Sequence, residues 1–167
     1  MALVAREGYA NTTVGEIASE AGVSRSTFYE QFESKEDCFR AAYDDVAARL
    51  IEAIREAASP VGDDPAARLA SGIRAYFEWS AEHPAAAATF VIEIHRAGPE
   101  ALEQRSQVLQ RFCEVIAERR PEVRPAAVKA LITGIDAMAH ECLRKGKAEE
   151  LRKQADDALY VAQRLLR

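Results

Sequence analysis

The residue order between Asn11 and Tyr43 constrains the fold of this chain more than any other feature. It predicts two short helices joined by a glycine turn, with a third helix behind them. Thr13 is followed three residues later by Glu16, the spacing of a capping box at a helix start. Gly22 stands where a helix end needs a residue that tolerates a positive φ angle. The pattern therefore predicts a helix-turn-helix, a motif that places its second helix in the major groove of DNA.

The residues after the turn extend the same pattern. Ser24 is placed to cap the second helix of the motif through its hydroxyl. Phe28 and Phe32 are four residues apart, so they share a helix face and are expected to enter one small core. Ser34 is placed to cap the following helix, with Asp37 in its first turn, where an anion suits the helix dipole.

These residues resemble the TetR family of bacterial transcriptional regulators. The resemblance runs from about position 2 to position 43 and rests on three segments: Gly-Tyr-Ala-Asn-Thr-Thr-Val, Ile-Ala-Ser-Glu-Ala-Gly-Val-Ser-Arg-Ser-Thr-Phe-Tyr-Glu-Gln-Phe and Ser-Lys-Glu-Asp. It implies an all-α fold in which an N-terminal three-helix domain with a helix-turn-helix, residues 1–45, is joined by a long helix to a C-terminal helical domain for ligand binding and dimerisation, residues 46–167. The partners implied are double-stranded operator DNA, a small-molecule effector and a second copy of the chain in a homodimer.

The function that the resemblance implies is a ligand-responsive, DNA-binding transcriptional regulator, most simply a repressor released from its operator by a small molecule. No Ser/His/Asp order, glycine-rich phosphate loop or pair of carboxylates suggests an enzyme, and no cofactor is expected. Three cysteines are an odd number with wide spacing, which favours a reduced cytoplasm over disulfides or a zinc site. No apolar run approaches the roughly 20 residues of a membrane span.

The net charge of −5 points toward an alternative function. Residues 1–43 carry four cationic and seven anionic side chains, although phosphate contacts supply much of the affinity for DNA. Relatives in the family normally have a longer first helix, often after a basic arm, whereas only residues 1–7 precede Gly8 here. The alternative is a helical dimeric ligand-binding or protein-interaction module with weak or lost DNA binding.

Helical periodicity, few glycines and prolines, and abundant alanine predict helices along the whole chain. The segment 59–64, rich in turn residues, is the clearest boundary. Asp64 and Pro65 then suit the cap and first position of the next helix. The expected helices span residues 2–7, 14–21, 25–32, 35–58, 65–82, 85–96, 100–119, 126–145 and 148–166.

Candidate DNA contacts cluster around the expected recognition helix, 25–32. Arg25 lies in its first turn and could pair with guanine O6 and N7; the alternative is a solvated charge. The hydroxyl of Tyr29 could donate to a phosphate, or the ring could pack on the preceding helix. Thr13 and Lys35 stand at helix starts that can bind a phosphate; the alternatives are that they cap the helix or are solvated side chains. The resemblance favours a phosphate contact for Tyr29 and Lys35. The candidate set is Thr13, Ser24, Arg25, Ser26, Thr27, Tyr29 and Lys35.

The middle helices concentrate aromatic side chains, with polar groups between them. A mostly apolar cavity with a few polar groups is typical of a small-molecule site, although ordinary core packing explains any single aromatic residue. Trp79 is expected near a cavity between the helices 65–82 and 85–96. The candidate pocket residues are Tyr76, Phe77, Trp79, Phe90, His95, Phe112 and Met138. The interleaved polar residues include Glu93, Asp136, His140 and Glu141. The run 140–142 does not predict a metal site, because adjacent helical residues point about 100° apart.

The last two helices suggest a dimer interface. Small residues on 126–145 would let another helix approach closely, and the helix 148–166 carries an apolar stripe, so two such helices from each chain could form a four-helix interface. The alternative is burial inside one chain. The candidate interface residues are Ala127, Ala130, Leu131, Gly134, Ala137, Ala155, Leu159 and Ala162.

Overall fold

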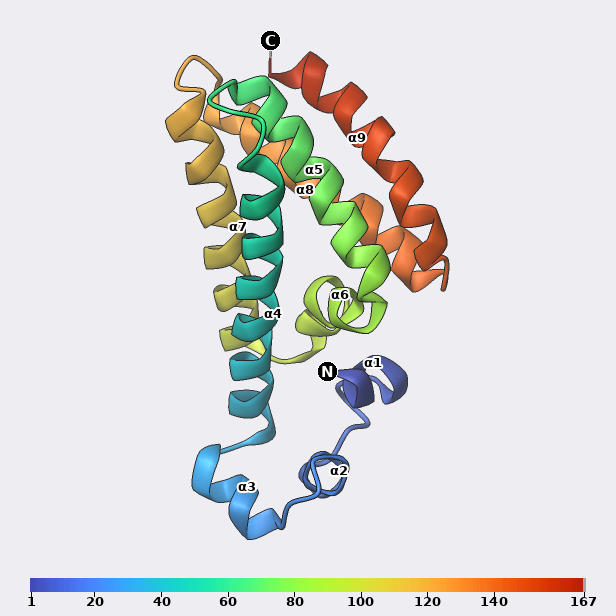
Figure 1. The fold of residues 1–167 in the computed structure, drawn as a ribbon. Coiled ribbons are helices and arrows are strands. Elements are labelled where there is room, and N and C mark those ends of the chain that lie inside the picture. Colours follow the sequence, from blue (N-terminus) through green and yellow to red (C-terminus); the bar gives the residue numbers. More distant parts are fainter. Residues whose placement is uncertain (167) are drawn as a thin grey trace.

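A computed structural model describes residues 1–166, and every regular element in that range is helical. The N-terminal part comprises three short helices, which the long helix α4 joins to the remaining helices (Figure 1). The elements are α1 (Ala2–Glu7), α2 (Val14–Glu20), α3 (Arg25–Gln31), α4 (Lys35–Ala58), α5 (Pro65–Glu82), α6 (Pro84–Val91), the 3₁₀ turn η1 (Glu93–Arg96), α7 (Pro99–Arg119), α8 (Pro125–Arg144), the 3₁₀ turn η2 (Ala148–Glu150) and α9 (Leu151–Leu165). The all-α expectation is confirmed.

Side-chain caps start the helices of the N-terminal part as the sequence predicts. The hydroxyl of Thr13 accepts from the backbone N–H of Glu16, and the Glu16 carboxylate accepts from the N–H of Thr13 at 2.8 Å, which completes the capping box. The hydroxyl of Ser24 caps α3 by accepting from the N–H of Thr27, and the hydroxyl of Ser34 caps α4 by accepting from the N–H of Asp37. Gly22 ends the α2 turn with φ 68°, a conformation that favours glycine.

Two of the expected helices are interrupted. The segment 85–96 forms α6 and then the tighter turn η1, and 148–166 begins with η2 before α9. After α6 ends at Val91, the chain bends so that Glu93 is buried beneath the start of the chain. Periodicity alone does not show such a bend, because the 3₁₀ turn keeps nearly the same spacing of apolar residues.

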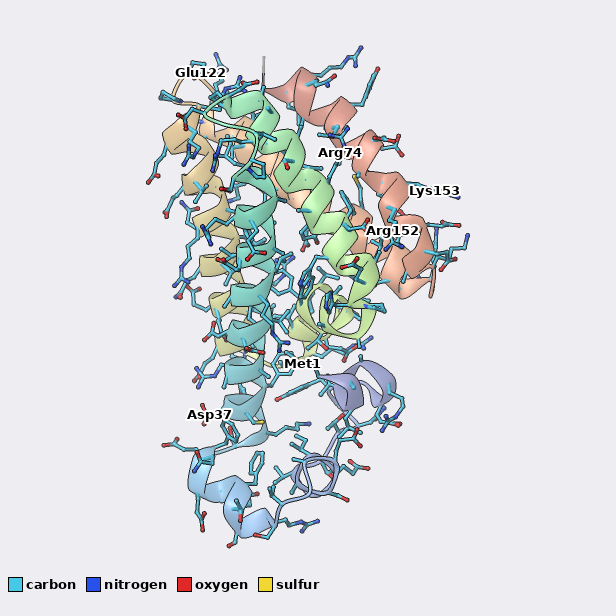
Figure 2. All side chains as sticks on the ribbon, viewed as in Figure 1. Met1, Asp37, Arg74, Glu122, Arg152 and Lys153 are labelled. Carbon is cyan, nitrogen blue, oxygen red and sulfur yellow. The ribbon has the colours of Figure 1, made fainter. Side chains whose placement is uncertain are left out.

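Two hydrophobic cores hold the helices together. One gathers α1, the middle of α4, α6, η1 and the start of α7, and the other gathers α5, α8 and α9. α9 packs along α5 and α8, and Arg152 on α9 pairs with Glu78 on α5 at 2.8 Å. Figure 2 shows Arg152 at this outer side of the bundle.

The N-terminal helices are tied to the rest of the chain at η1. The carboxylate of Glu93 accepts a hydrogen bond from the backbone N–H of Tyr9 at 2.6 Å and pairs with Arg96 at 2.6 Å. Glu93 is 6% exposed, so this bond is shielded from water. Lower on α4, Arg40 pairs with Glu100 of α7 at 3.1 Å. We call the contact of Glu93 with Tyr9 the Glu93 latch.

Candidate functional site

The helix α3 presents a polar face to solvent. Phe28 is its buried anchor, packed with Phe32 at 5.4 Å between ring centroids, and it fixes α3 against the other N-terminal helices. The candidate DNA contacts on and before this helix, Ser24, Arg25, Ser26, Thr27 and Tyr29, are all exposed. Tyr29 is 57% exposed, so its hydroxyl is free to meet a partner outside the chain.

Two glycines shape the surroundings of α3. Gly22 makes the turn before it, and Gly15 on α2 faces the guanidinium of Arg25 so closely that a Cβ there would collide with it. The absence of a side chain at Gly15 therefore gives Arg25 room to lie along α2. Sequence reasoning missed this contact, since a glycine inside a short helix carries no signal about its neighbour.

Lys35 has an internal role that its sequence position did not indicate. Its ammonium donates to the backbone carbonyls of Tyr9 and Thr12 at 2.8 and 2.9 Å, and it lies 4.2 Å from the centroid of the Tyr9 ring. Lys35 thus fastens the loop before α2 to the start of α4. An ammonium has three donors, so one remains for a phosphate.

We expect Arg25→Ala to reduce discrimination between operator and unrelated DNA by about 1–3 kcal/mol, the loss predicted for a bidentate arginine–guanine pair. Binding of both DNAs, measured by fluorescence anisotropy at several salt concentrations, gives the difference. Arg49→Ala removes another exposed arginine, on α4, and serves as the control. Equal losses of binding affinity for both DNAs would indicate that Arg25 contacts a phosphate and not a base.

A cavity of about 600 Å³ lies between α4, α5, α7 and α8. Its walls are mainly apolar and come from these four helices and from Phe90 of α6: Ile51, Ile54, Ala58, Leu69, Gly72, Ile73, Tyr76, Phe90, Leu109, Phe112, Val115, Ile116, Ile132 and Ile135. Such a volume suits a small-molecule ligand. Three of the seven candidate pocket residues, Tyr76, Phe90 and Phe112, line this cavity.

The structure places the other four candidates elsewhere. Phe77 is fully buried in the core of α5, α8 and α9, and Met138 packs against the same core. Trp79 stacks on His83 at 4.7 Å in the core near α1, which corrects its expected position beside the cavity. His95 is exposed on η1. Aromatic residues on one helix point to different sides, so only the tertiary packing decides which of them meets the cavity.

Apart from Asp136, the charged residues of the cavity lining are exposed or half-buried. They include five arginines and two glutamates, which we call the arginine rim: Arg55, Arg68, Arg111, Arg119, Arg120, Glu114 and Glu118. Most of them lie on α7 or at its end, and Arg55 lies opposite on α4, so the cavity opens between these helices. Within residues 1–166, Arg111 and Arg119 form no ion pair.

Away from the rim, the mainly apolar wall of the cavity includes one buried charged group. Asp136 lines it and forms an ion pair with Arg105, and each of these side chains is only 15% exposed. Burial raises the pKa of Asp136, and the neighbouring Arg105 opposes that rise. Burial likewise raises the pKa values of Tyr43 and Tyr76, so both phenols stay protonated. The sequence pointed to Asp136 and Tyr76 as polar and pocket candidates, but it did not predict that Arg105 and Tyr43 lie close to them.

The candidate dimer residues divide into two groups. Ala130, Gly134 and Ala137 are exposed on α8, and Ala127 is half-buried. Leu131 is buried in the core of its own chain, which corrects its assignment to an interface. The same correction applies to three residues of α9 that pack within the chain: Ala155, Leu159 and Ala162. The apolar side chains that α9 does expose are Tyr160, Val161 and Leu165.

Two further observations concern the described residues 1–166. No three His, Cys, Asp or Glu side chains in this range gather as a metal-ligand set. None of its helices combines the length and the apolar character that crossing a bilayer requires.

The comparison with known protein families agrees with this arrangement. Residues 1–42 match the model of the bacterial regulatory proteins of the tetR family, the segment that contains α1 to α3 and the start of α4. A curated relative, the HTH-type transcriptional regulator EthR of Mycolicibacterium smegmatis, is 28% identical over 155 residues, covering 89% of this chain and 71% of that protein. Residues 1–42 therefore match the tetR family, and over most of its length the chain is similar to a helix-turn-helix transcriptional regulator.

Solved structures share the fold over nearly the whole chain. The fatty acid degradation regulator FadR from Bacillus halodurans superimposes with a TM-score of 0.82 at 21% identity, covering 98% of this chain and 91% of that one. FadR from Bacillus subtilis, solved in complex with stearoyl-CoA, superimposes with a TM-score of 0.83 at 20% identity and with the same coverages of both chains. A tetR-family regulator from Rhodococcus RHA1 gives 0.72 at 22% identity, covering 98% and 90%. At these identities the likeness concerns the fold.

Proposed function

We propose that this chain is a homodimeric repressor that leaves its operator when an amphiphilic effector enters the cavity. The effector has a long apolar chain and an anionic group. The observation that carries this proposal is the 600 Å³ cavity, whose walls are apolar and whose mouth holds the arginine rim. Burying an apolar chain in such a cavity releases about 0.8 kcal/mol per methylene group.

The rim favours an anion even though the whole chain is acidic. Five arginines face two glutamates there, whereas the net charge of the chain is −5. Arg111 and Arg119 are exposed and lie on the same helix, so each can donate hydrogen bonds to an anionic group at the rim. An effector whose anionic group stays at the rim and whose apolar chain enters the cavity matches both the basic rim and the apolar walls.

The related folds support the same class of effector. FadR from Bacillus subtilis binds stearoyl-CoA, an anionic molecule with a long apolar chain, and FadR from Bacillus halodurans regulates fatty acid degradation. A fatty acyl-CoA thioester is therefore the first effector to test on this chain.

The dimer would use the exposed face of α8 together with the exposed apolar residues of α9. Because Gly134 and Ala130 are small, a partner helix could approach this face closely. A Cβ added at Gly134 would meet no atom of the same chain within 4 Å. Tyr160, at 57% exposure, is a large side chain on α9 that such an interface would cover. A dimer places two recognition helices on successive major grooves, about 34 Å apart.

Coupling between cavity and DNA would run through α4 and the Glu93 latch. Phe90, a cavity residue, stacks on Tyr43 of α4 at 4.8 Å with nearly parallel rings. Three residues after Phe90, Glu93 of η1 holds the N-terminal helices by accepting a hydrogen bond from the backbone N–H of Tyr9. An effector that displaces Phe90 thus acts on both connections to the recognition helix and shifts the population away from the DNA-binding spacing.

The effector affinity should rise with acyl chain length. In a series of saturated acyl-CoA thioesters from octanoyl to stearoyl, each added methylene group should tighten binding about fourfold, until the cavity is full. Calorimetry measures the affinities, and release of a labelled operator should follow the same order, because coupling between two sites is reciprocal. An affinity independent of chain length, with no release of DNA, would refute an apolar chain as the effector.

A further inference from the structure

A second polar region lies at the buried part of the cavity, away from the arginine rim. Tyr43, Tyr76, Arg105 and Asp136 meet there, and each comes from a different helix: α4, α5, α7 and α8. Asp136 and Tyr76 line the cavity itself. We call these four residues the inner polar cluster.

The inner polar cluster has hydrogen-bonding capacity that the chain itself does not use. Arg105 and Asp136 pair through one guanidinium nitrogen and one carboxylate oxygen. Three further polar atoms of the cluster, Arg105 Nε, Asp136 Oδ1 and the hydroxyl of Tyr43, are buried and have no partner among the described residues. Buried polar atoms are nearly always hydrogen-bonded, so these atoms indicate a partner that comes from outside the chain.

The chemistry of the unpaired atoms defines that partner. Arg105 Nε donates a hydrogen bond, Asp136 Oδ1 accepts one, and the Tyr43 hydroxyl does either. The ion pair already balances its own charges, so a further charged group would be buried without compensation at a high cost. A neutral group that both donates and accepts meets these requirements, and a hydroxyl is the smallest such group.

Resting on the function proposed above, we propose that the inner polar cluster is a specificity subsite for a hydroxyl group carried on the buried part of the effector chain. The effector class is then a hydroxylated long-chain acyl compound rather than a plain saturated one. Because Tyr43 belongs to α4, the same hydroxyl would also contact the helix that carries the DNA-binding domain.

The test compares stearic acid with a series of hydroxystearic acids whose single hydroxyl moves along the chain. Calorimetry on the full chain should show at least one isomer that binds about tenfold more tightly than stearic acid, as expected for hydrogen bonds to charged groups. In Tyr43→Phe this preference should shrink. In the double variant Arg105→Met with Asp136→Leu, stearic acid should bind more tightly than every isomer.

The double variant is expected to fold, because apolar residues of similar volume often replace a buried ion pair without loss of stability. Thermal melting by circular dichroism checks this, and Ser106→Ala, which removes an exposed hydroxyl on α7, is the control. If wild type prefers stearic acid to every isomer, or if the double variant keeps the preference for a hydroxyl, the subsite is refuted while the apolar-chain effector stands. If neither these acids nor stearoyl-CoA binds, both proposals fail.

Discussion

Gly134→Trp should convert the proposed homodimer to monomers and weaken operator binding on the order of a thousandfold. Linking two binding modules raises affinity by 10²–10⁴ over one module, and a monomer carries only one recognition helix. Nothing lies within 4 Å of a Cβ built at Gly134, so the single chain has space for the new side chain. The loss would therefore come from the partner helix and not from misfolding.

Sedimentation measures the change in mass, and far-ultraviolet circular dichroism checks that helicity is kept. Ser106→Trp puts the same side chain on an exposed position of α7 and should stay dimeric. A Gly134→Trp protein that remains a dimer with normal operator affinity would place the interface on another face.

Ile132→Trp should weaken effector binding roughly fiftyfold and leave DNA binding close to wild type. Ile132 is half-buried on α8 and lines the cavity. A larger side chain there excludes about three methylene groups of an acyl chain, and each of these contributes about 0.8 kcal/mol. The bulk enters open space instead of a packed core, so little strain is expected.

The measurement is a titration of stearoyl-CoA against the complex of the protein with labelled operator. The midpoint for DNA release should move by the same factor as the effector affinity. Leu102→Trp adds the same bulk on α7 at an exposed position that does not line the cavity, and it should respond as wild type does. Release of DNA at an unchanged midpoint in Ile132→Trp would place the effector outside this cavity.

The sequence by itself determined the features that depend on neighbouring residues. The capping box of Thr13 and Glu16, the cap at Ser34 and the turn at Gly22 are local, so their residue types predict the starts and ends of helices to within a residue or two. The resemblance of residues 2–43 to a family added the DNA-binding role, because those short segments are specific. The exposed polar face of α3 follows from the buried Phe28 on its opposite side.

Only the tertiary structure decided which apolar residues meet which partner. The stripe of α9 predicts a buried face, but Ala155 and Leu159 bury it against their own chain, and periodicity carries no information on that choice. Likewise Tyr76 reaches the cavity and Trp79 does not, although they are three residues apart on one helix.

The pairs that define the site and its coupling are also tertiary. Arg105 and Asp136 are 31 residues apart in sequence, and Tyr9 and Glu93 are 84 apart. Nothing in the sequence distinguishes each of these residues from an ordinary charged or aromatic side chain. Its partner is determined only by the packing of α7 on α8 or of α1 on α6. Local physics therefore determined the helices and the DNA-reading motif, whereas the long-range packing of those helices created the cavity and its polar end.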